Sequence, residues 1–77
     1  MAKRPGIPLA DLAAHRRARG ESQSTFWARF GVTQSGGSRY ESGARLPVAT
    51  GMLVLAFIEG MLDDDHFRKL AERFREQ

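Results

Sequence analysis

The chain of 77 residues contains no cysteine. Without thiols, neither a disulfide framework nor a cysteine-ligated zinc site can hold the fold, so stability must come from apolar packing. No apolar run approaches the roughly 20 residues that span a membrane, and the N-terminus lacks the apolar segment of a signal peptide. These absences predict a cytoplasmic protein without a membrane partner.

Groups of catalytic or metal-binding side chains are also scarce. His15 and His66 have no partner set that fits a metal site or acid-base catalysis, and we interpret both as surface residues. The carboxylates of residues 63–65 are contiguous, so they point in different directions and lack the spacing of a calcium loop, whereas they suit the start of a helix. A chain this short forms one domain with little room for a pocket. We therefore expect no enzymatic activity, metal, cofactor or small-molecule ligand.

The net charge of +3 conceals a difference between the two halves of the chain. Residues 1–45 carry eight basic and three acidic residues, a net charge of +5, whereas residues 46–77 carry four basic and six acidic residues, a net charge of −2. A basic half attracts a polyanion, although basic faces are often merely solvated. Charge alone therefore leaves nucleic acid open as a partner.

Apolar periodicity and stop signals predict five helices and no strand, an all-α bundle. The helices are expected at about residues 9–19, 23–30, 34–42 and 48–61 and from residue 63 onward, and together they form a single domain over residues 9–77. Residues 1–8 contain two prolines and a glycine, which predicts a flexible arm. The fourth helix is apolar all round and should be the most buried. The fifth carries an apolar stripe interpreted as packing residues: Phe67, Leu70, Ala71 and Phe74.

The second and third helices are joined by a tight turn. Ser22 can cap the second helix, whose inner face carries Phe26 and Phe30. Gly31 can adopt the left-handed conformation that ends this helix, and Thr33 offers the next N-cap. The third helix ends at Gly43 and directs Tyr40 inward. Its outward side is rich in amide, hydroxyl and guanidinium groups, which can bind base edges and phosphates: Gln34, Ser35, Ser38 and Arg39.

These residues resemble the Cro/C1-type, or Xre, family of helix-turn-helix DNA-binding proteins. The resemblance covers about residues 9–57 and rests on matches at Gln23, residues 31–35, residues 38–41, Gly43 and residues 45–47. The short form with Phe26, Trp27 and residues 33–41 is also similar to the small RsaL-type repressors of quorum-sensing loci. The implied fold is a five-helix, lambda-repressor-like bundle with a helix-turn-helix.

The resemblance implies roles for individual residues in DNA binding. In similar proteins, the glutamine at the position of Gln23 binds a phosphate and braces the one at the position of Gln34, which could bind adenine N6 and N7. Arg39 is a candidate for a bidentate contact with guanine, and Arg45 for a contact with the DNA backbone. The candidate DNA-binding residues are Gln23, Thr33, Gln34, Ser35, Ser38, Arg39 and Arg45, with Lys3 and Arg4 as a loose tail or a minor-groove arm.

The resemblance also implies two structural contacts. Arg16 occupies the place of a first-helix arginine that pairs with the glutamate at the position of Glu41. Trp27 stands where relatives usually have alanine, and Gly37 stands where they usually have isoleucine or valine. We interpret this as an exchange of size across one contact, which conserves volume.

The sequence therefore predicts a sequence-specific duplex-binding transcriptional regulator, in particular a repressor, that reads the major groove with residues 34–42. A homodimer is expected because paired recognition helices lengthen the site. Its interface could come from apolar residues that the monomer core could also consume: Met52, Leu55, Ile58, Met61 and Phe67. The alternative is a protein-interaction module, such as an antitoxin or antirepressor partner, on the same scaffold.

Overall fold

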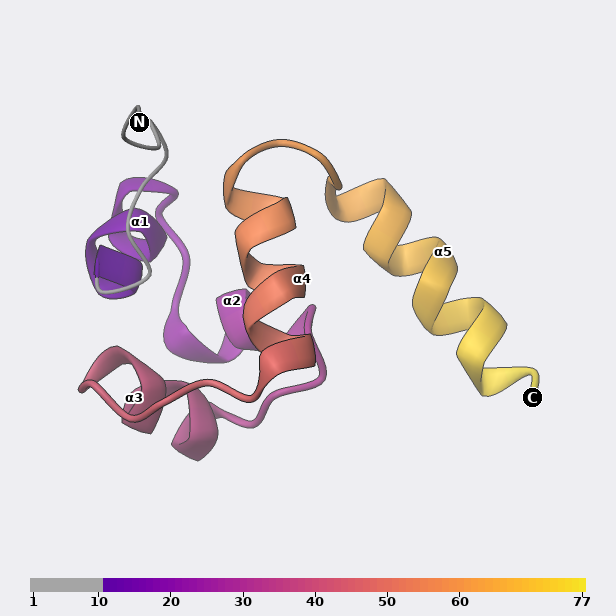
Figure 1. The fold of residues 1–77 in the computed structure, drawn as a ribbon. Helices are drawn as coiled ribbons and strands as arrows, with labels where there is room; N and C mark the ends of the chain where they lie inside the picture. Colours follow the sequence, from indigo (N-terminus) through magenta and orange to yellow (C-terminus); the bar gives the residue numbers. More distant parts are fainter. Residues whose placement is uncertain (1–10) are drawn as a thin grey trace, which may run out of the picture.

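The computed structural model describes residues 11–77 and shows five α-helices, with no strand in that range (Figure 1). They are α1 (Leu12–Ala18), α2 (Gln23–Ala28), α3 (Gln34–Glu41), α4 (Val48–Ile58) and α5 (Asp64–Arg75). The first four gather around a common centre, and α5 runs outward from them (Figure 1). The predicted all-α, five-helix architecture is confirmed. The predicted arm, and the predicted helix start at Leu9, lie outside the described residues.

Side-chain caps begin three of the helices. The Ser22 hydroxyl accepts a hydrogen bond from the Thr25 amide at 3.1 Å, which starts α2. Thr33 Oγ1 accepts from the Gly36 amide at 3.1 Å and starts α3. Asp63 Oδ1 accepts from the His66 amide, and His66 Nδ1 accepts from the Asp63 amide, both at 3.1 Å. Each pair satisfies backbone donors that the first helical turn leaves unpaired.

Glycines with positive φ angles follow the first four helices: Gly20, Gly31, Gly43 and Gly60. Gly31, with φ of +74°, has the predicted left-handed conformation, but it lies in the turn after α2, which ends at Ala28 and not at residue 30. Gly60 has φ of +82° and lies just beyond α4, which ends at Ile58. The predicted extension of this helix to Met61 is therefore wrong. The reason is that the left-handed conformation, which glycine adopts without steric cost, turns the chain toward α5.

The core is largely aromatic and centres on α2. Its buried side chains are Leu12, Phe26, Trp27, Val54, Phe57 and Phe67. The Phe26 and Trp27 rings meet edge to face with centroids 5.2 Å apart, and the Phe30 and Phe67 rings do the same at 5.2 Å. Phe67 thereby joins the start of α5 to the bundle. Edge-to-face pairs of this kind add to the stability gained from buried area.

The fourth helix has the smallest share of exposed residues of the five helices, as expected, but it is not covered on every side. Val48 is 79% and Met52 65% exposed, whereas Phe26 and Trp27 of α2 have no exposed surface. The short helices pack against one side of α4, so its other side stays uncovered. No helix in the described part of the chain is long and apolar enough to cross a membrane.

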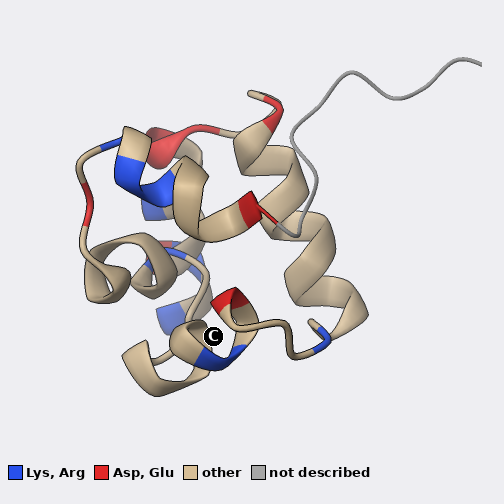
Figure 2. Cartoon of the chain, turned by 90° about the vertical axis from the view of Figure 1, so that its left-hand side faces the viewer, with Lys and Arg blue, Asp and Glu red and all other residues tan. Residues whose placement is uncertain are grey.

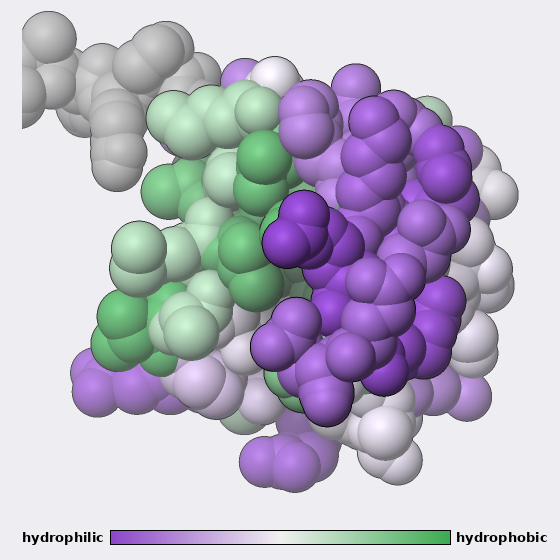
Figure 3. Space-filling view, turned by 90° about the vertical axis from the view of Figure 1, so that its right-hand side faces the viewer, coloured by the Kyte–Doolittle hydropathy of each residue, from purple (hydrophilic) through white to green (hydrophobic). Residues whose placement is uncertain are grey.

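The stripe of α5 is also only partly a packing surface. Phe67 is buried, but Leu70 is 51% and Phe74 80% exposed, because α5 leaves the bundle after its first turns. The interpretation of the whole stripe as packing residues is therefore wrong. Among the residues considered for an interface, Phe67 is consumed by the core, Leu55 and Ile58 are half-buried, and Met52 and Met61 are exposed. Figure 3 shows the side of the molecule on which α5 lies, where apolar surface borders polar side chains.

Candidate DNA interface

The turn between α2 and α3 fixes the direction of α3. The Val32 amide donates to the Trp27 carbonyl at 3.1 Å, so the chain folds back directly after Gly31. Thr33 then starts α3 through its side-chain cap. This arrangement of two short helices is a helix-turn-helix.

The outward face of α3 carries the predicted reading residues. Gln34, Ser35 and Arg39 are exposed, and Ser38 is half-buried. The Ser42 hydroxyl donates a hydrogen bond to the Ser38 backbone carbonyl at 2.9 Å. This bond does not use the Ser38 hydroxyl. The structure therefore brings the four residues together on one helix, with Gln34 at its start.

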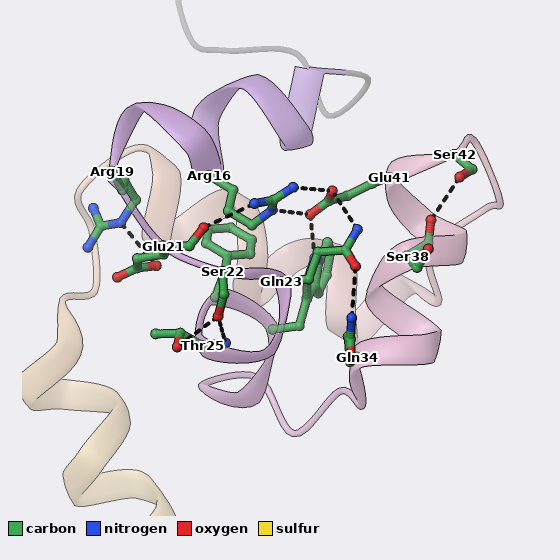
Figure 4. A network of polar contacts seen from close by, with 12 residues as sticks. Arg16, Arg19, Glu21, Ser22, Gln23, Thr25, Gln34, Ser38, Glu41 and Ser42 are labelled. Carbon is green, nitrogen blue, oxygen red and sulfur yellow. Dashed lines mark hydrogen bonds and ion pairs between the residues drawn. The ribbon is translucent and has the colours of Figure 1, made fainter.

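Gln23 and Gln34 are neighbours across the turn, as the resemblance implied. Gln34 Nε2 lies 3.4 Å from Gln23 Oε1, the longest hydrogen bond of the network in Figure 4. Gln23 Nε2 donates to Glu41 Oε1 at 3.1 Å. Gln23 thus connects the first residue of α3 with the last.

Glu41 accepts four hydrogen bonds from three side chains. Arg16 donates through Nε to Oε2 at 2.8 Å and through Nη2 to Oε1 at 3.0 Å, so the predicted ion pair is present and bidentate. Gln23 and Trp27 supply the other two donors, with Trp27 Nε1 at 2.8 Å from Oε2. The Arg16 and Glu41 side chains are only 11% and 5% exposed. These donors, Arg16 above all, lower the pKa of Glu41 from 4.5 to about 2.

Trp27 therefore has a second role that the sequence interpretation missed. Its ring fills the space beside Gly37, where a Cβ atom would overlap Cδ1 and Cγ of the indole and lie 2.8 Å from Nε1. Its N–H also holds Glu41, and its ring lies 5.6 Å from that of Tyr40. The signal was that a lone buried tryptophan needs an acceptor for its N–H group.

Arg45 lies exposed in the segment between α3 and α4. No ion pair within residues 11–77 involves Arg17, Arg39 or Arg45, whereas Arg16, Arg19 and Arg29 are all paired with acidic groups. Figure 2 accordingly shows basic segments interleaved with acidic ones. The positive charge of the first half is thus partly neutralised within the fold. Lys3 and Arg4 lie outside the described residues.

A second ion-pair cluster, which no sequence pattern indicated, joins α2 to α5. Arg29 donates through Nη1 and Nη2 to the Glu21 carboxylate at 2.8 and 2.9 Å, and through Nε to Asp64 Oδ1 at 2.7 Å. Its guanidinium carbon lies 4.3 Å from the ring centroid of Phe57. Bonding to Arg29 lowers the pKa of Glu21. The described residues contain no group of His, Cys, Asp and Glu side chains that could hold a metal ion.

Comparisons with known proteins agree with this geometry. Residues 13–55 match the model of the RsaL-like HTH domain. The chain is 47% identical to a solved structure described in a study of the regulatory mechanism of the quorum-sensing repressor RsaL in Pseudomonas aeruginosa, with a TM-score of 0.75. That match covers 82% of this chain and 94% of the other. The comparison with curated proteins yields no match.

Proposed function

The chain belongs to the family of RsaL-like helix-turn-helix domains, and from this premise we propose that it is a DNA-binding transcriptional repressor that reads the major groove with α3. Its solved relative is a quorum-sensing repressor, and we place this chain in the same kind of regulation. We also propose that the protein has no catalytic activity and that it acts in the cytoplasm, because its proposed ligand is duplex DNA.

The observation that carries the proposal is the exposed face of α3 and the support beneath it. Gln34, Ser35 and Arg39 are exposed on α3, and the nearly buried ion pair between Arg16 and Glu41 holds the last residue of the same helix. Donors and acceptors held in this way can match the distinct pattern that each base pair presents in the major groove. A protein-interaction module that did not bind DNA would not need a polar and basic surface on α3.

Selection of binding sites from random duplexes tests this function. We expect enrichment of one motif, and its two halves should be inverted repeats with centres about 10 base pairs apart if two recognition helices bind adjacent turns of DNA. A pool that stays random after repeated rounds would contradict sequence-specific binding. An enriched half-site without a repeat would contradict the dimer.

Arg39 and Arg45 should differ in how their loss affects binding to the selected site. Arg39→Ala should cost about 1–3 kcal/mol and relax the preference at one base position. Arg45→Ala should weaken binding to all sequences alike and reduce the slope of log affinity against log salt by about 1. Fluorescence anisotropy with matched and mismatched duplexes at several salt concentrations distinguishes the two. Identical base preferences in native protein and Arg39→Ala would show that Arg39 does not contribute to base recognition.

We further propose that the chain binds DNA as a homodimer through the exposed apolar residues of α5. Leu70 and Phe74 are four residues apart, so they share one face of the helix, and both are largely exposed in the single chain. Exposed apolar surface of this kind marks an interaction site. A second copy fits because a single recognition helix contacts only a few base pairs.

Phe74→Glu should convert the dimer to a monomer without unfolding it. Phe74 is 80% exposed, so its replacement removes no core packing, while a carboxylate in an apolar interface has no partner. Sedimentation equilibrium should give twice the chain mass for native protein and the chain mass for the variant. Val48→Glu, at an equally exposed apolar position on α4, serves as the matched control and should remain dimeric. A native protein that sediments as a monomer at micromolar concentration would contradict the proposal.

A further inference from the structure

Three polar side chains form a line from the nearly buried carboxylate of Glu41 to the outer surface of α3. Glu41 Oε1 accepts from Gln23 Nε2 at 3.1 Å, and Gln23 Oε1 accepts from Gln34 Nε2 at 3.4 Å (Figure 4). Glu41 is 5% exposed and Gln34 is exposed. The line therefore joins a buried charge to a side chain that faces solvent.

The carboxylate of Glu41 fixes which end of the Gln23 amide faces it. Glu41 is ionised at neutral pH, because its pKa is about 2, so both of its oxygens can only accept hydrogen bonds. Arg16 and Trp27 provide further donors to the same two oxygens and hold the carboxylate in place. A reversed Gln23 amide would set its oxygen against a carboxylate oxygen. Gln23 must therefore present Nε2 to Glu41 and Oε1 to its other neighbour.

The direction of the Gln23 amide in turn orients Gln34. Since Gln23 offers an acceptor, Gln34 turns one N–H inward and keeps its Oε1 and its second N–H for another partner. One acceptor beside one donor complements N6 and N7 of adenine. With Gln23 reversed, Gln34 would be braced through Oε1 and would present two N–H donors, which complement O6 and N7 of guanine.

We propose that Glu41 is a positioning residue for base recognition: acting through Gln23, it sets the amide direction of Gln34 and favours adenine over guanine at the base pair that Gln34 contacts. This inference rests on the proposed function, because it requires that α3 enter the major groove. It assigns Glu41 a role in specificity in addition to its ion pair with Arg16.

The test compares adenine with guanine at one position of the selected site. That position is the one at which Gln34→Ala loses its base preference. Native protein should bind the adenine duplex at least about fivefold more tightly than the guanine duplex, the lower end of the range for a bidentate base contact. Glu41→Gln lets residue 41 donate as well as accept, so the ratio should fall by at least roughly threefold.

Gln23→Met and Trp27→Phe separate orientation from stability. Gln23→Met interrupts the line but keeps the ion pair between Arg16 and Glu41. It should therefore lower the adenine-to-guanine ratio as Glu41→Gln does. It also tests the inference if Glu41→Gln does not fold. Trp27→Phe removes a donor to Glu41 Oε2 and lowers stability, but it leaves the bond from Gln23 unchanged. It should keep the native ratio, measured where circular dichroism shows each variant folded.

The outcomes distinguish failure of this inference from failure of the proposed function. If Gln23→Met kept the native adenine-to-guanine affinity ratio, the inference would be overturned while sequence-specific binding stayed intact. The same would follow if Gln34→Ala kept the native base preference at every position of the site. An equal fall in the ratio for Trp27→Phe and Glu41→Gln would also overturn it, because loss of stability would then be the cause. Failure of native protein to enrich any duplex would overturn the proposed function, and the inference with it.

Discussion

Replacing Gly37 with alanine should destabilise the protein by about 2 kcal/mol or more, although alanine is the better helix former. The added Cβ atom would overlap the indole of Trp27, which has no exposed surface and is held by its hydrogen bond to Glu41. Relief of the overlap requires movement of the ring or of α3. Overpacking of this kind outweighs the gain of about 1 kcal/mol from helix propensity.

Gly36→Ala is the matched control for this prediction. It lies in the same helix, but its Cβ would be 3.1 Å from Val32 Cγ1 and 3.3 Å from Thr33 Oγ1, which small shifts can accommodate. Thermal unfolding should place the Tm of Gly37→Ala at least about 10 °C below that of Gly36→Ala. If Gly37→Ala were the more stable variant, with Trp27 still in its native position, the exchange of size between Trp27 and Gly37 would be refuted.

Arg16→Ala should cost about 3 kcal/mol of unfolding free energy, whereas Arg17→Ala should cost less than about 0.5 kcal/mol. Loss of Arg16 leaves the nearly buried carboxylate of Glu41 with only the donors of Gln23 and Trp27. Arg17 lies exposed on the same helix, so it controls for the loss of a basic group and for helix propensity. Urea unfolding at pH 7 gives the comparison, and equal midpoints for the two variants would refute the stabilising role of the pair.

The dependence of stability on pH gives a second readout of the same pair. The pKa of Glu41 is lower in the fold, at about 2, than its ordinary 4.5, so ionised Glu41 stabilises the fold fully above pH 4.5 and loses this contribution as the pH falls toward 2. Removal of Arg16, the largest cause of the shift, should raise this pKa. The stability difference between native protein and Arg16→Ala should therefore narrow on acidification. A constant difference between pH 7 and pH 2 would contradict this account.

The parts of the fold that sequence could predict depend on local signals. Ser22 and Thr33 cap helices through bonds to residues three positions away, and Gly31 turns the chain after α2 by its own backbone conformation. Such features are encoded within a few residues. The contacts of Arg16 with Glu41 and of Trp27 with Gly37 are more distant, and they became predictable only through resemblance to a known family.

The features that sequence did not reveal depend on the arrangement of whole helices. Trp27 and Gln23 meet at Glu41, 14 and 18 residues away, and Arg29 meets Asp64 35 residues away, with no pattern to link them. The exposed side of α4, with Val48 and Met52, could not be predicted either, because an apolar sequence pattern does not show whether a neighbour covers each face. The outward course of α5, which exposes Phe74, is likewise set by the turn at Gly60 and by Phe67.

The central claim is that α3 enters the major groove, and an NMR titration of the protein with its selected duplex tests it most directly. The largest chemical-shift changes should fall at residues 33–39 and at Arg45, with intermolecular NOEs from Gln34 and Arg39 to thymine methyl or cytosine H5 protons, which lie in the major groove. Shift changes confined to α4 and α5, with α3 unaffected and no such NOEs, would contradict it.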